Sequence, residues 1–311
     1  MHAYSLPPLV AIVGPTAVGK TALAVALAQR SGGEIVNADS RQIYRFMDIG
    51  TAKPSPEELL AARHHLIDIV GPDAPFSLAV YQALALQAID TITTRGHIPL
   101  LVGGTGQYVT AVVEGWSMPR VPPQPALRTR LEAEAATQGT HMLFARLQRI
   151  DPVAAAKIEP NNLRRIVRAL EVYELTGLPI SAQQTKQPPP YHVTTIWLSM
   201  DRTPLYARID TRVDAMMQAG LLAEVQGLLE RGYSWDLPAM SSLGYKEFRP
   251  YFEHNVPLDE CVERLKFNTH AFVRKQEMWF RRLPNVVRLP ADAPDLLEQV
   301  HALIHGSTQP S

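Results

Sequence analysis

Short apolar runs alternate with longer amphipathic segments over the first hundred residues. The runs LVAIV (9–13), EIVNA (34–38), HLIDIV (65–70) and IPLLVGG (98–104) have the length of buried strands. Helical spacing is found between them, over 20–30 and 78–95, and glycines follow both segments. Strands joined by helical crossovers predict an α/β fold, a parallel sheet flanked by helices.

Two proline clusters interrupt this alternation. SMPRVPPQP (117–125) and KQPPPYH (186–192) enclose three segments with helical spacing, at 126–138, 142–149 and 162–176. TTIWLSM (194–200) then predicts a returning core strand, and helices are expected near 204–231 and 259–282. We predict a core of residues 1–116 and 194–311 and a helical insertion domain of residues 117–193.

Composition narrows the class of protein. The chain has 311 residues, of which 46% are hydrophobic and 19% charged, as in ordinary globular proteins. No apolar stretch approaches the roughly 20 residues that span a bilayer, and the first residues lack a secretion signal, so we expect a cytoplasmic protein with no membrane partner. The single cysteine, Cys261, excludes an internal disulfide. Thirty basic and thirty acidic side chains cancel, so a nucleic acid would have to be bound by local patches.

The stretch GPTAVGKT follows the first apolar run and precedes the first helix. It spells the phosphate-binding pattern G-x-x-x-x-G-K-T, in which backbone N–H groups, the helix N-terminus and the Lys20 ammonium hold a polyphosphate. The Thr21 hydroxyl can hold Mg²⁺ there. The predicted phosphate-binding residues are Gly14, Pro15, Thr16, Ala17, Val18, Gly19, Lys20 and Thr21. The loop does not reveal whose phosphate it binds.

Two further residues follow predicted strands. Carboxyl ends of parallel strands line the ligand crevice of an open α/β sheet, so Asp39 and Thr105 are expected near the phosphates. Asp39 is either a turn cap or a base or metal-associated carboxylate. Thr105 either faces the phosphates or belongs to a plain turn at the end of a strand.

Six motifs together resemble the tRNA dimethylallyltransferases. They are GPTAVGKTALA, DSRQIYRFMDIGTAKP, LVGGTGQY, NNLRRIVRALEVYELTG, LYARIDTRVDAMMQAGLLAEV and SSLGYKEF, in the order of that family and over most of the chain. The resemblance implies a P-loop NTPase-like core and transfer of a dimethylallyl group from dimethylallyl pyrophosphate to N6 of the adenosine 3′ of the anticodon. The phosphate would then belong to a leaving group and not to a nucleotide.

The resemblance also assigns roles to single residues. Asp39 would accept the proton of the adenine amine, Thr105 would lie near the pyrophosphate and the amine, and Arg212 would add a second cation beside Lys20. Mg²⁺, held by Thr21, would stabilise the departing pyrophosphate. Without the resemblance, Arg212 reads as part of a solvated helix face.

Basic clusters supply the candidate contacts to the tRNA anticodon stem-loop. Arg164 and Arg168 share a helix face, and RKQEMWFRR (274–282) mixes cations with aromatic rings that can stack on unpaired bases. Read alone, such clusters are usually solvated, and Trp279 equally suits a core. The resemblance implies tRNA contacts at Asp39, Ser40, Arg41, Gln42, Thr105, Arg128, Arg164, Arg165, Arg168, Ser241, Ser242, Gly244, Tyr245, Lys246, Arg274, Lys275, Gln276, Trp279 and Arg281.

Two other classes of protein compete with the transferase. A P-loop small-molecule kinase or phosphotransferase would use the same loop but leaves DSRQIYRFMDIGTAKP and the second half of the chain unexplained. An RNA-binding module with a vestigial loop would not need Lys20, Thr21 and Asp39 together. We expect the transferase, acting as a monomer.

Overall fold

A computed structural model describes residues 6–119 and 121–306. Within these ranges the chain divides into two compact units, one formed by residues 6–113 and 189–306 and the other lying within Glu114–Pro188. Each unit has its own hydrophobic core. None of the helices within the described ranges is long and apolar enough to cross a membrane.

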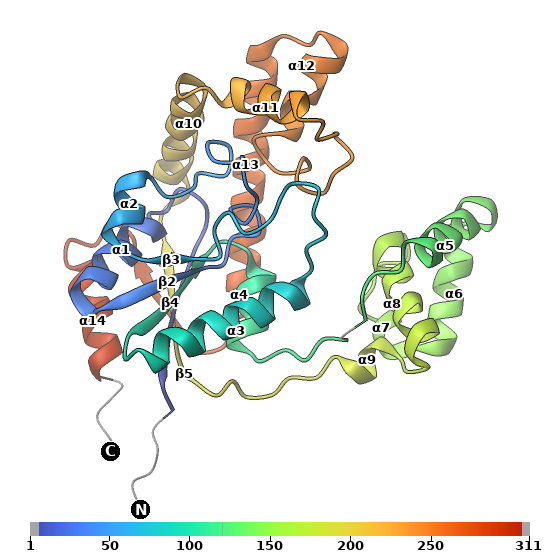
Figure 1. The fold of residues 1–311 in the computed structure, drawn as a ribbon, viewed down its shortest axis with the longest axis horizontal. Helices are drawn as coiled ribbons and strands as arrows, with labels where there is room; N and C mark the ends of the chain where they lie inside the picture. Colours follow the sequence, from blue (N-terminus) through green and yellow to red (C-terminus); the bar gives the residue numbers. More distant parts are fainter. Residues whose placement is uncertain (1–5, 120, 307–311) are drawn as a thin grey trace, which may run out of the picture. The chain divides into compact units, whose positions relative to one another are not determined.

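The first unit is built on a sheet of six parallel strands in the order β3-β2-β4-β1-β5-β6 (Figure 1). The strands are β1 (Pro8–Val13), β2 (Gly33–Asn37), β3 (His64–His65), β4 (Ile98–Gly103), β5 (His192–Ser199) and β6 (Val286–Pro290). β1 is an interior strand that pairs with β4 on one side and β5 on the other. The loops that leave β1 and β4 therefore emerge side by side.

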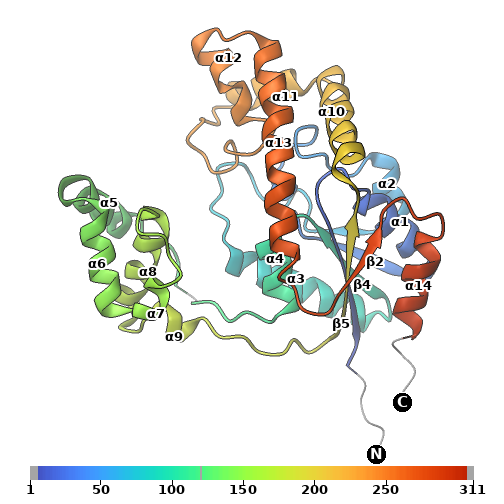
Figure 2. The ribbon, with the colours of Figure 1, turned by 180° about the vertical axis from the view of Figure 1, so that it is seen from behind.

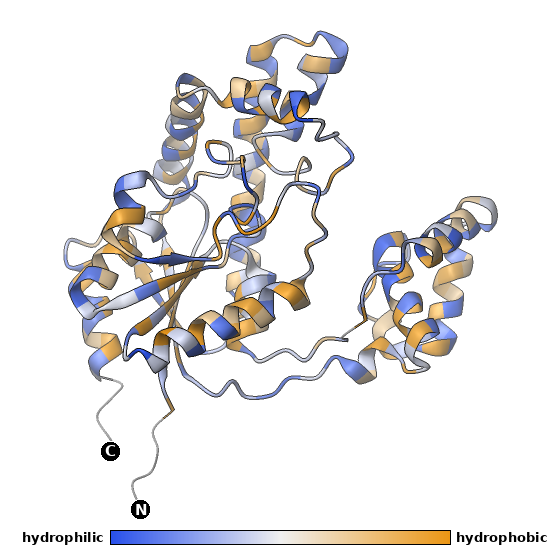
Figure 3. Ribbon diagram, in the orientation of Figure 1, coloured by the Kyte–Doolittle hydropathy of each residue, from blue (hydrophilic) through white to orange (hydrophobic). Residues whose placement is uncertain are grey.

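Helices cover both faces of this sheet. α1 and α14 contact each other on one face, and α3 and α4 pack together on the other (Figures 1 and 2). The helices of this unit are α1 (Lys20–Ser31), α2 (Pro56–Ala61), α3 (Leu78–Thr94), α4 (Gly106–Val113), α10 (Arg202–Gln218), α11 (Leu221–Glu230), the 3-10 helix η1 (Lys246–Phe248), α12 (Arg249–His254), α13 (Leu258–Phe280) and α14 (Leu296–Gly306). The helices carry hydrophilic and hydrophobic stripes, as expected when one face is buried (Figure 3).

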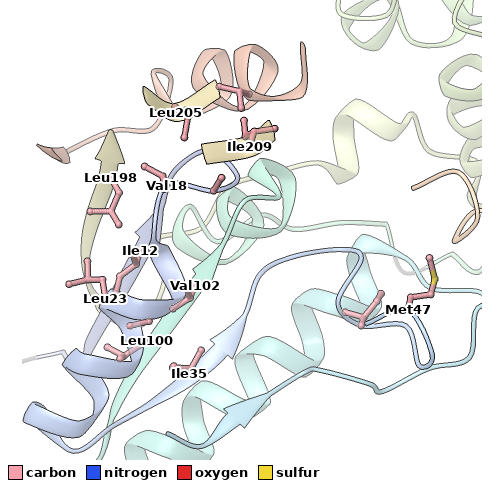
Figure 4. Close-up of a cluster of buried hydrophobic side chains, with 14 of the residues drawn as sticks. Ile12, Val18, Leu23, Ile35, Met47, Leu100, Val102, Leu198, Leu205 and Ile209 are labelled. Atoms are coloured by element: carbon pink, nitrogen blue, oxygen red, sulfur yellow. The ribbon is translucent and has the colours of Figure 1, made fainter. Parts of the chain in front are cut away.

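The alternation of side chains along β1 explains the two layers. Val10 and Ile12 point into the core that contains α1, whereas Leu9, Ala11 and Val13 point into the core beneath α3. Figure 4 shows the first of these cores, where Ile12 lies among side chains of β4, β5 and α1. Because both faces are buried, the interior strands β1 and β4 read as continuous apolar runs.

The second unit is a small helical domain. It contains α5 (Pro125–Gln138), α6 (Thr140–Ile150), α7 (Pro152–Ala155), α8 (Leu163–Thr176) and α9 (Ile180–Gln183), which enclose a core that includes Leu131, Leu147 and Leu170. At its base the two connecting segments pair with each other. Ser117 N–H donates to Thr185 O at 2.8 Å, Gln187 N–H donates to Gly115 O at 2.9 Å, and Lys186 forms an ion pair with Glu114.

The predicted fold class is confirmed, and three details differ from the prediction. The strand predicted at 65–70 is limited to His64–His65, because Leu66 and Asp68 adopt positive φ angles of 64° and 57° that end the extended backbone. The helical region 204–231 is two helices, since Gly220 (φ 98°) separates α10 from α11. The boundaries of the insertion also shift. Residues 189–193 belong to the core, because β5 already pairs with β1 at His192, and residues 114–116 belong to the insertion, because Gly115 and Trp116 pair with its other end.

Candidate active site

The P-loop connects β1 to α1. Gly19 precedes the helix with φ 106°, a conformation that an L side chain rarely adopts, and no side chain caps the helix N-terminus. The first N–H groups of α1 therefore have no partner within the helix and are oriented for an anion. The Thr21 hydroxyl at this end has no hydrogen-bond partner among the residues that the structure describes.

Lys20 folds back over its own loop. Its ammonium donates to Gly14 O at 3.0 Å and to Pro15 O at 2.8 Å. Burial lowers the pKa of Lys20 from 10.5 to about 8; the Asp39 carboxylate raises the pKa and Arg212 lowers it. An anion bound beside Lys20 would stabilise its charged form.

Arg212, on α10, is the second cation of this site. Burial lowers the pKa of its guanidinium, which Glu58 in turn raises, and no side chain in the described ranges forms an ion pair with it. Two partly buried cations that line one pocket favour an anionic ligand with several oxygens. Three polar contacts with α13 fix the position of α10. They are the ion pairs Arg202–Glu277 and Asp214–Lys266 and the hydrogen bond between Asp210 Oδ1 and His270 Nε2 at 2.8 Å.

Asp39 lies just after β2, in a tight polar turn. One carboxylate oxygen, Oδ1, accepts the Arg41 N–H at 2.9 Å, while the other has no donor among the described residues. Asn37 stabilises this turn. Its Oδ1 accepts the Asp39 N–H, and its Nδ2 donates to Asp39 O and to Leu66 O. The cap and the base hypotheses are therefore compatible, since one oxygen caps the turn and the other stays available.

Thr105 locks this turn to the loop after β4. Its hydroxyl accepts the Ser40 N–H at 2.9 Å and donates to Ser40 Oγ at 3.2 Å, and the Thr105 N–H donates to Ala38 O at 3.2 Å. Gly103 permits this contact, because a Cβ there would lie 2.2 Å from the backbone of Ala38. The structure thus links Thr105 to the turn of Asp39 through Ser40, whereas Asp39 lines the pocket described next and Thr105 is not among its lining residues.

A pocket of about 740 Å³ opens next to these groups. Its polar lining includes Lys20, Thr21, Asp39, Arg212 and Gln276. Its apolar lining includes Ala24, Ile35, Ile49, Ile67, Val102, Ala215, Met216, Ala219 and Phe272. One cavity therefore offers cations for a polyphosphate, a carboxylate and apolar surface. No group of three or more His, Cys, Asp or Glu side chains is arranged to hold a metal within the described ranges.

Segment 48–50 forms part of the pocket wall and is held by Glu224 of α11. The N–H groups of Asp48 and Ile49 donate to Oε2 at 2.9 and 2.8 Å, and that of Gly50 donates to Oε1 at 3.1 Å. The Tyr245 hydroxyl donates to the same Oε1 at 2.6 Å. Burial and the nearby carboxylate raise the pKa of Tyr245, so this hydroxyl stays protonated.

The predicted tRNA-contacting residues of the core fall into two groups. Ser241, Lys246, Arg274, Lys275 and Arg281 are exposed. Ser242, Gly244, Tyr245 and Gln276 are buried, and Trp279 donates through Nε1 to Thr110 Oγ1 at 2.8 Å. Among the loop residues, Arg41 donates to Pro238 O and Gln42 to Thr51 O and Ala52 O. The exposed side chains are available to a partner, and the buried ones hold the protein together.

The insertion carries the other predicted contacts. Arg164 and Arg165 are exposed on α8. Arg128 and Arg168 both bind Glu171, which is 0% exposed and also accepts the Gln124 N–H. Burial raises the pKa of Glu171, but the hydrogen bonds from Arg128, Gln124 and Arg168 outweigh it and lower that pKa to about 2.

Sequence reasoning missed three residues of the site. Asn37 supports the turn of Asp39, Glu224 fixes the pocket wall, and Phe272 contributes apolar lining. Only Asn37 had a local signal, because it stands two positions before Asp39 at the end of a strand. The other two are contributed by helices more than a hundred residues further along the chain.

The fold and the site define a class. A P-loop after an interior strand of a parallel sheet is typical of α/β proteins that bind a polyphosphate, and in this chain a carboxylate and a second cation line the same pocket. The family model for IPP transferase matches residues 42–283, and the chain belongs to this family.

Individual relatives are similar over nearly the whole chain. A tRNA dimethylallyltransferase from Roseiflexus castenholzii is 64% identical over 96% of this chain and 97% of its own, and one from Chloroflexus aggregans is 63% identical over 92% and 97%. The crystal structure of the tRNA isopentenylpyrophosphate transferase from Bacillus halodurans is 43% identical, with a TM-score of 0.72 over 96% of each chain. A eukaryotic dimethylallyltransferase, solved acting on tRNA, is 27% identical, with a TM-score of 0.83 over 98% of this chain and 80% of its own. The resemblance inferred from the motifs is confirmed.

Proposed function

We propose that this protein transfers a dimethylallyl group from dimethylallyl pyrophosphate to N6 of the adenosine 3′ of the anticodon in tRNA. The observation that carries the proposal is the pocket that combines Lys20 and Arg212, the Asp39 carboxylate and an apolar wall. A five-carbon prenyl pyrophosphate has an anionic end and an apolar end, and the pocket offers a matching surface to each. The names of the relatives support the same reaction.

The nucleophile in this reaction is weak. The lone pair of an adenine amine is delocalised into the ring, so a carboxylate must accept its proton as the new C–N bond forms. Asp39 has a free carboxylate oxygen for this proton, and Asn37 and Thr105 hold its turn in place. The proton passes to Asp39, the allylic carbon gains nitrogen, and its bond to the pyrophosphate oxygen breaks.

The departing pyrophosphate gains negative charge as that bond breaks. Lys20, Arg212 and the first N–H groups of α1 face the space where this charge develops, and they would stabilise it. The Thr21 hydroxyl fits Mg²⁺, which takes few protein ligands and shares the rest of its shell with phosphate and water. Bound there, Mg²⁺ would act as a Lewis acid on the pyrophosphate.

Contact with tRNA is proposed for the exposed basic side chains. On the core these are Lys246, Arg274, Lys275 and Arg281, and on the insertion Arg164 and Arg165. The overall charge is zero, so these local groups would supply the attraction to phosphates. We propose that the protein acts as a monomer.

A mass measurement tests the reaction. The protein is incubated with Mg²⁺, dimethylallyl pyrophosphate and unmodified tRNA, and the nucleosides are analysed for an adenosine that has gained C5H8. A parallel reaction contains ATP in place of dimethylallyl pyrophosphate. Modified adenosine in the first reaction alone supports the transferase, whereas tRNA-stimulated release of ADP in the second would favour the kinase.

A further inference from the structure

Gln276 connects two loops of the site that lie far apart in the sequence. Its Oε1 accepts the Thr16 N–H of the P-loop at 2.9 Å, and its Nε2 donates to Gly104 O at 2.9 Å. The side chain belongs to α13 and is 5% exposed. Its amide therefore bridges the loops that leave the neighbouring strands β1 and β4.

The two loops carry opposite halves of the proposed reaction. The P-loop leads into Lys20 and Thr21, which face the leaving pyrophosphate. Gly104 precedes Thr105, whose hydroxyl holds the turn of Asp39 on the side of the adenine amine. A change in the spacing of the loops would therefore change the distance between the leaving group and the base.

Side chains of α13 approach these loops closely. A Cβ on Gly104 would lie 2.4 Å from Gln276 Nε2, and a Cβ on Gly106 would lie 2.2 Å from the Trp279 ring, so a side chain at either position would displace the Gln276 amide or the Trp279 ring. Trp279 is also bonded to Thr110 of α4. A buried amide is costly unless both of its atoms are bonded, so the Gln276 amide defines one spacing of the loops. An apolar side chain of similar size would fill the same volume but would not define the spacing of the two loops.

We propose that Gln276 is a positioning residue that sets the distance between the pyrophosphate loop and the loop of Thr105. The inference rests on the proposed function, because it assigns a role within that reaction. Gln276 acts inward, toward the reacting groups, and its exposed neighbours Arg274 and Lys275 face outward. Each loop keeps its own binding groups when the bridge is removed. Removal of the bridge should therefore disturb the alignment of the two reactants, and so the transfer rate, more than it weakens their binding.

Two substitutions test this role. Gln276→Met removes both hydrogen bonds at similar volume, and Gln276→Glu keeps an acceptor for Thr16 but places a carboxylate oxygen against Gly104 O. Single-turnover rates with saturating substrates are compared with the affinities for tRNA and for inorganic pyrophosphate with Mg²⁺. We expect the rate to fall by about 10- to 100-fold while both affinities change by less than about threefold. Glu263→Gln, on the same helix with its side chain 72% exposed, is the matched control.

Other results would overturn the proposal. A loss of tRNA affinity at an unchanged rate would indicate that Gln276 contacts the RNA. If the rate and both affinities stay unchanged, the bridge contributes only to packing. Gly104→Ala tests the same spacing with Gln276 intact, if the Gln276 variants fail to fold, and it should lower the rate in the same way. Wild-type protein that forms no modified adenosine would instead refute the proposed function.

Discussion

The lowered pKa of Lys20 predicts that pyrophosphate binding weakens in mildly alkaline solution. The free site holds this ammonium at a pKa of about 8, instead of 10.5, chiefly because it is buried. A bound pyrophosphate favours the charged form and so raises the pKa. Binding near pH 8 should therefore take up a proton, and affinity should fall as pH rises through 8.

The size of the effect follows from the protonated fraction. With a pKa of about 8, roughly nine in ten Lys20 side chains are charged at pH 7 and roughly one in ten at pH 9. If only the charged form binds, affinity falls about tenfold over this interval, or about 1.4 kcal/mol. A lysine with a pKa of 10.5 would remain almost fully charged at pH 9, and no comparable loss would occur.

Calorimetric titration with inorganic pyrophosphate and Mg²⁺ between pH 6.5 and 9.5 measures this dependence. Pyrophosphate has its own titration, which also affects the variant Lys20→Met, so the ratio of the two affinities isolates the lysine. A ratio that stays constant up to pH 9.5 would refute the reasoning.

The stability of the ligand-free protein should depend on pH in the opposite direction to its affinity for pyrophosphate. Between pH 8 and 10.5 the unfolded chain binds more protons at Lys20 than the folded chain, so the free energy of unfolding should rise with pH relative to Lys20→Met.

Three further predictions concern other parts of the molecule. Asp39→Asn should lower the transfer rate at least about a hundredfold, because the base is removed, with tRNA affinity nearly unchanged; normal turnover of the folded variant would exclude Asp39 from its role. Glu224→Gln places an amide N–H against the N–H groups of segment 48–50, so thermal unfolding should show a loss of about 1–3 kcal/mol, and the KM for dimethylallyl pyrophosphate should rise. Identical melting curves would contradict this. The double variant Arg164→Ala and Arg165→Ala should make the slope of log affinity for tRNA against log salt concentration shallower. The expected change is up to about 0.7 to 0.9 for each phosphate that an arginine no longer neutralises. An unchanged slope would mean that both arginines are only solvated and do not contact tRNA. Arg168 is left intact because it binds Glu171.

Local patterns were sufficient for the central features of the fold. The apolar runs of β1 and β4 are continuous because both faces of the sheet are buried, and the glycines of GPTAVGKT mark a loop that must approach an anion. The strand expected at 65–70 does not continue beyond His65, because the apolar residues there are partly buried without extended backbone: Leu66, Ile69 and Val70 pack against the two cores, and Ile67 lines the pocket. The hydropathy of a segment indicates whether its side chains are buried, but it does not indicate the backbone angle φ of each residue.

The long-range polar contacts could not be predicted from the sequence. The partners of Gln276 stand 260 and 172 positions away, and no local spacing links them. Arg128 and Arg168 look like free basic residues in sequence, yet Glu171, buried in the same domain, binds both. Glu171 shares its helix with Arg168, but the third member of this cluster comes from α5. Which charged residues are neutralised becomes visible only when helices are packed.

The paired segments at the base of the insertion influence how the chain folds. β5 must find β1, but about 75 residues of insertion interrupt the chain before it. The insertion has its own core, and the hydrogen bond from Ser117 to Thr185 holds its two ends together. If it folds first, the loop from β4 to β5 shrinks roughly sixfold, which lowers the entropy cost of closing it by about 1.5 kcal/mol. An insertion that folds early thus shortens the search that β5 makes for β1.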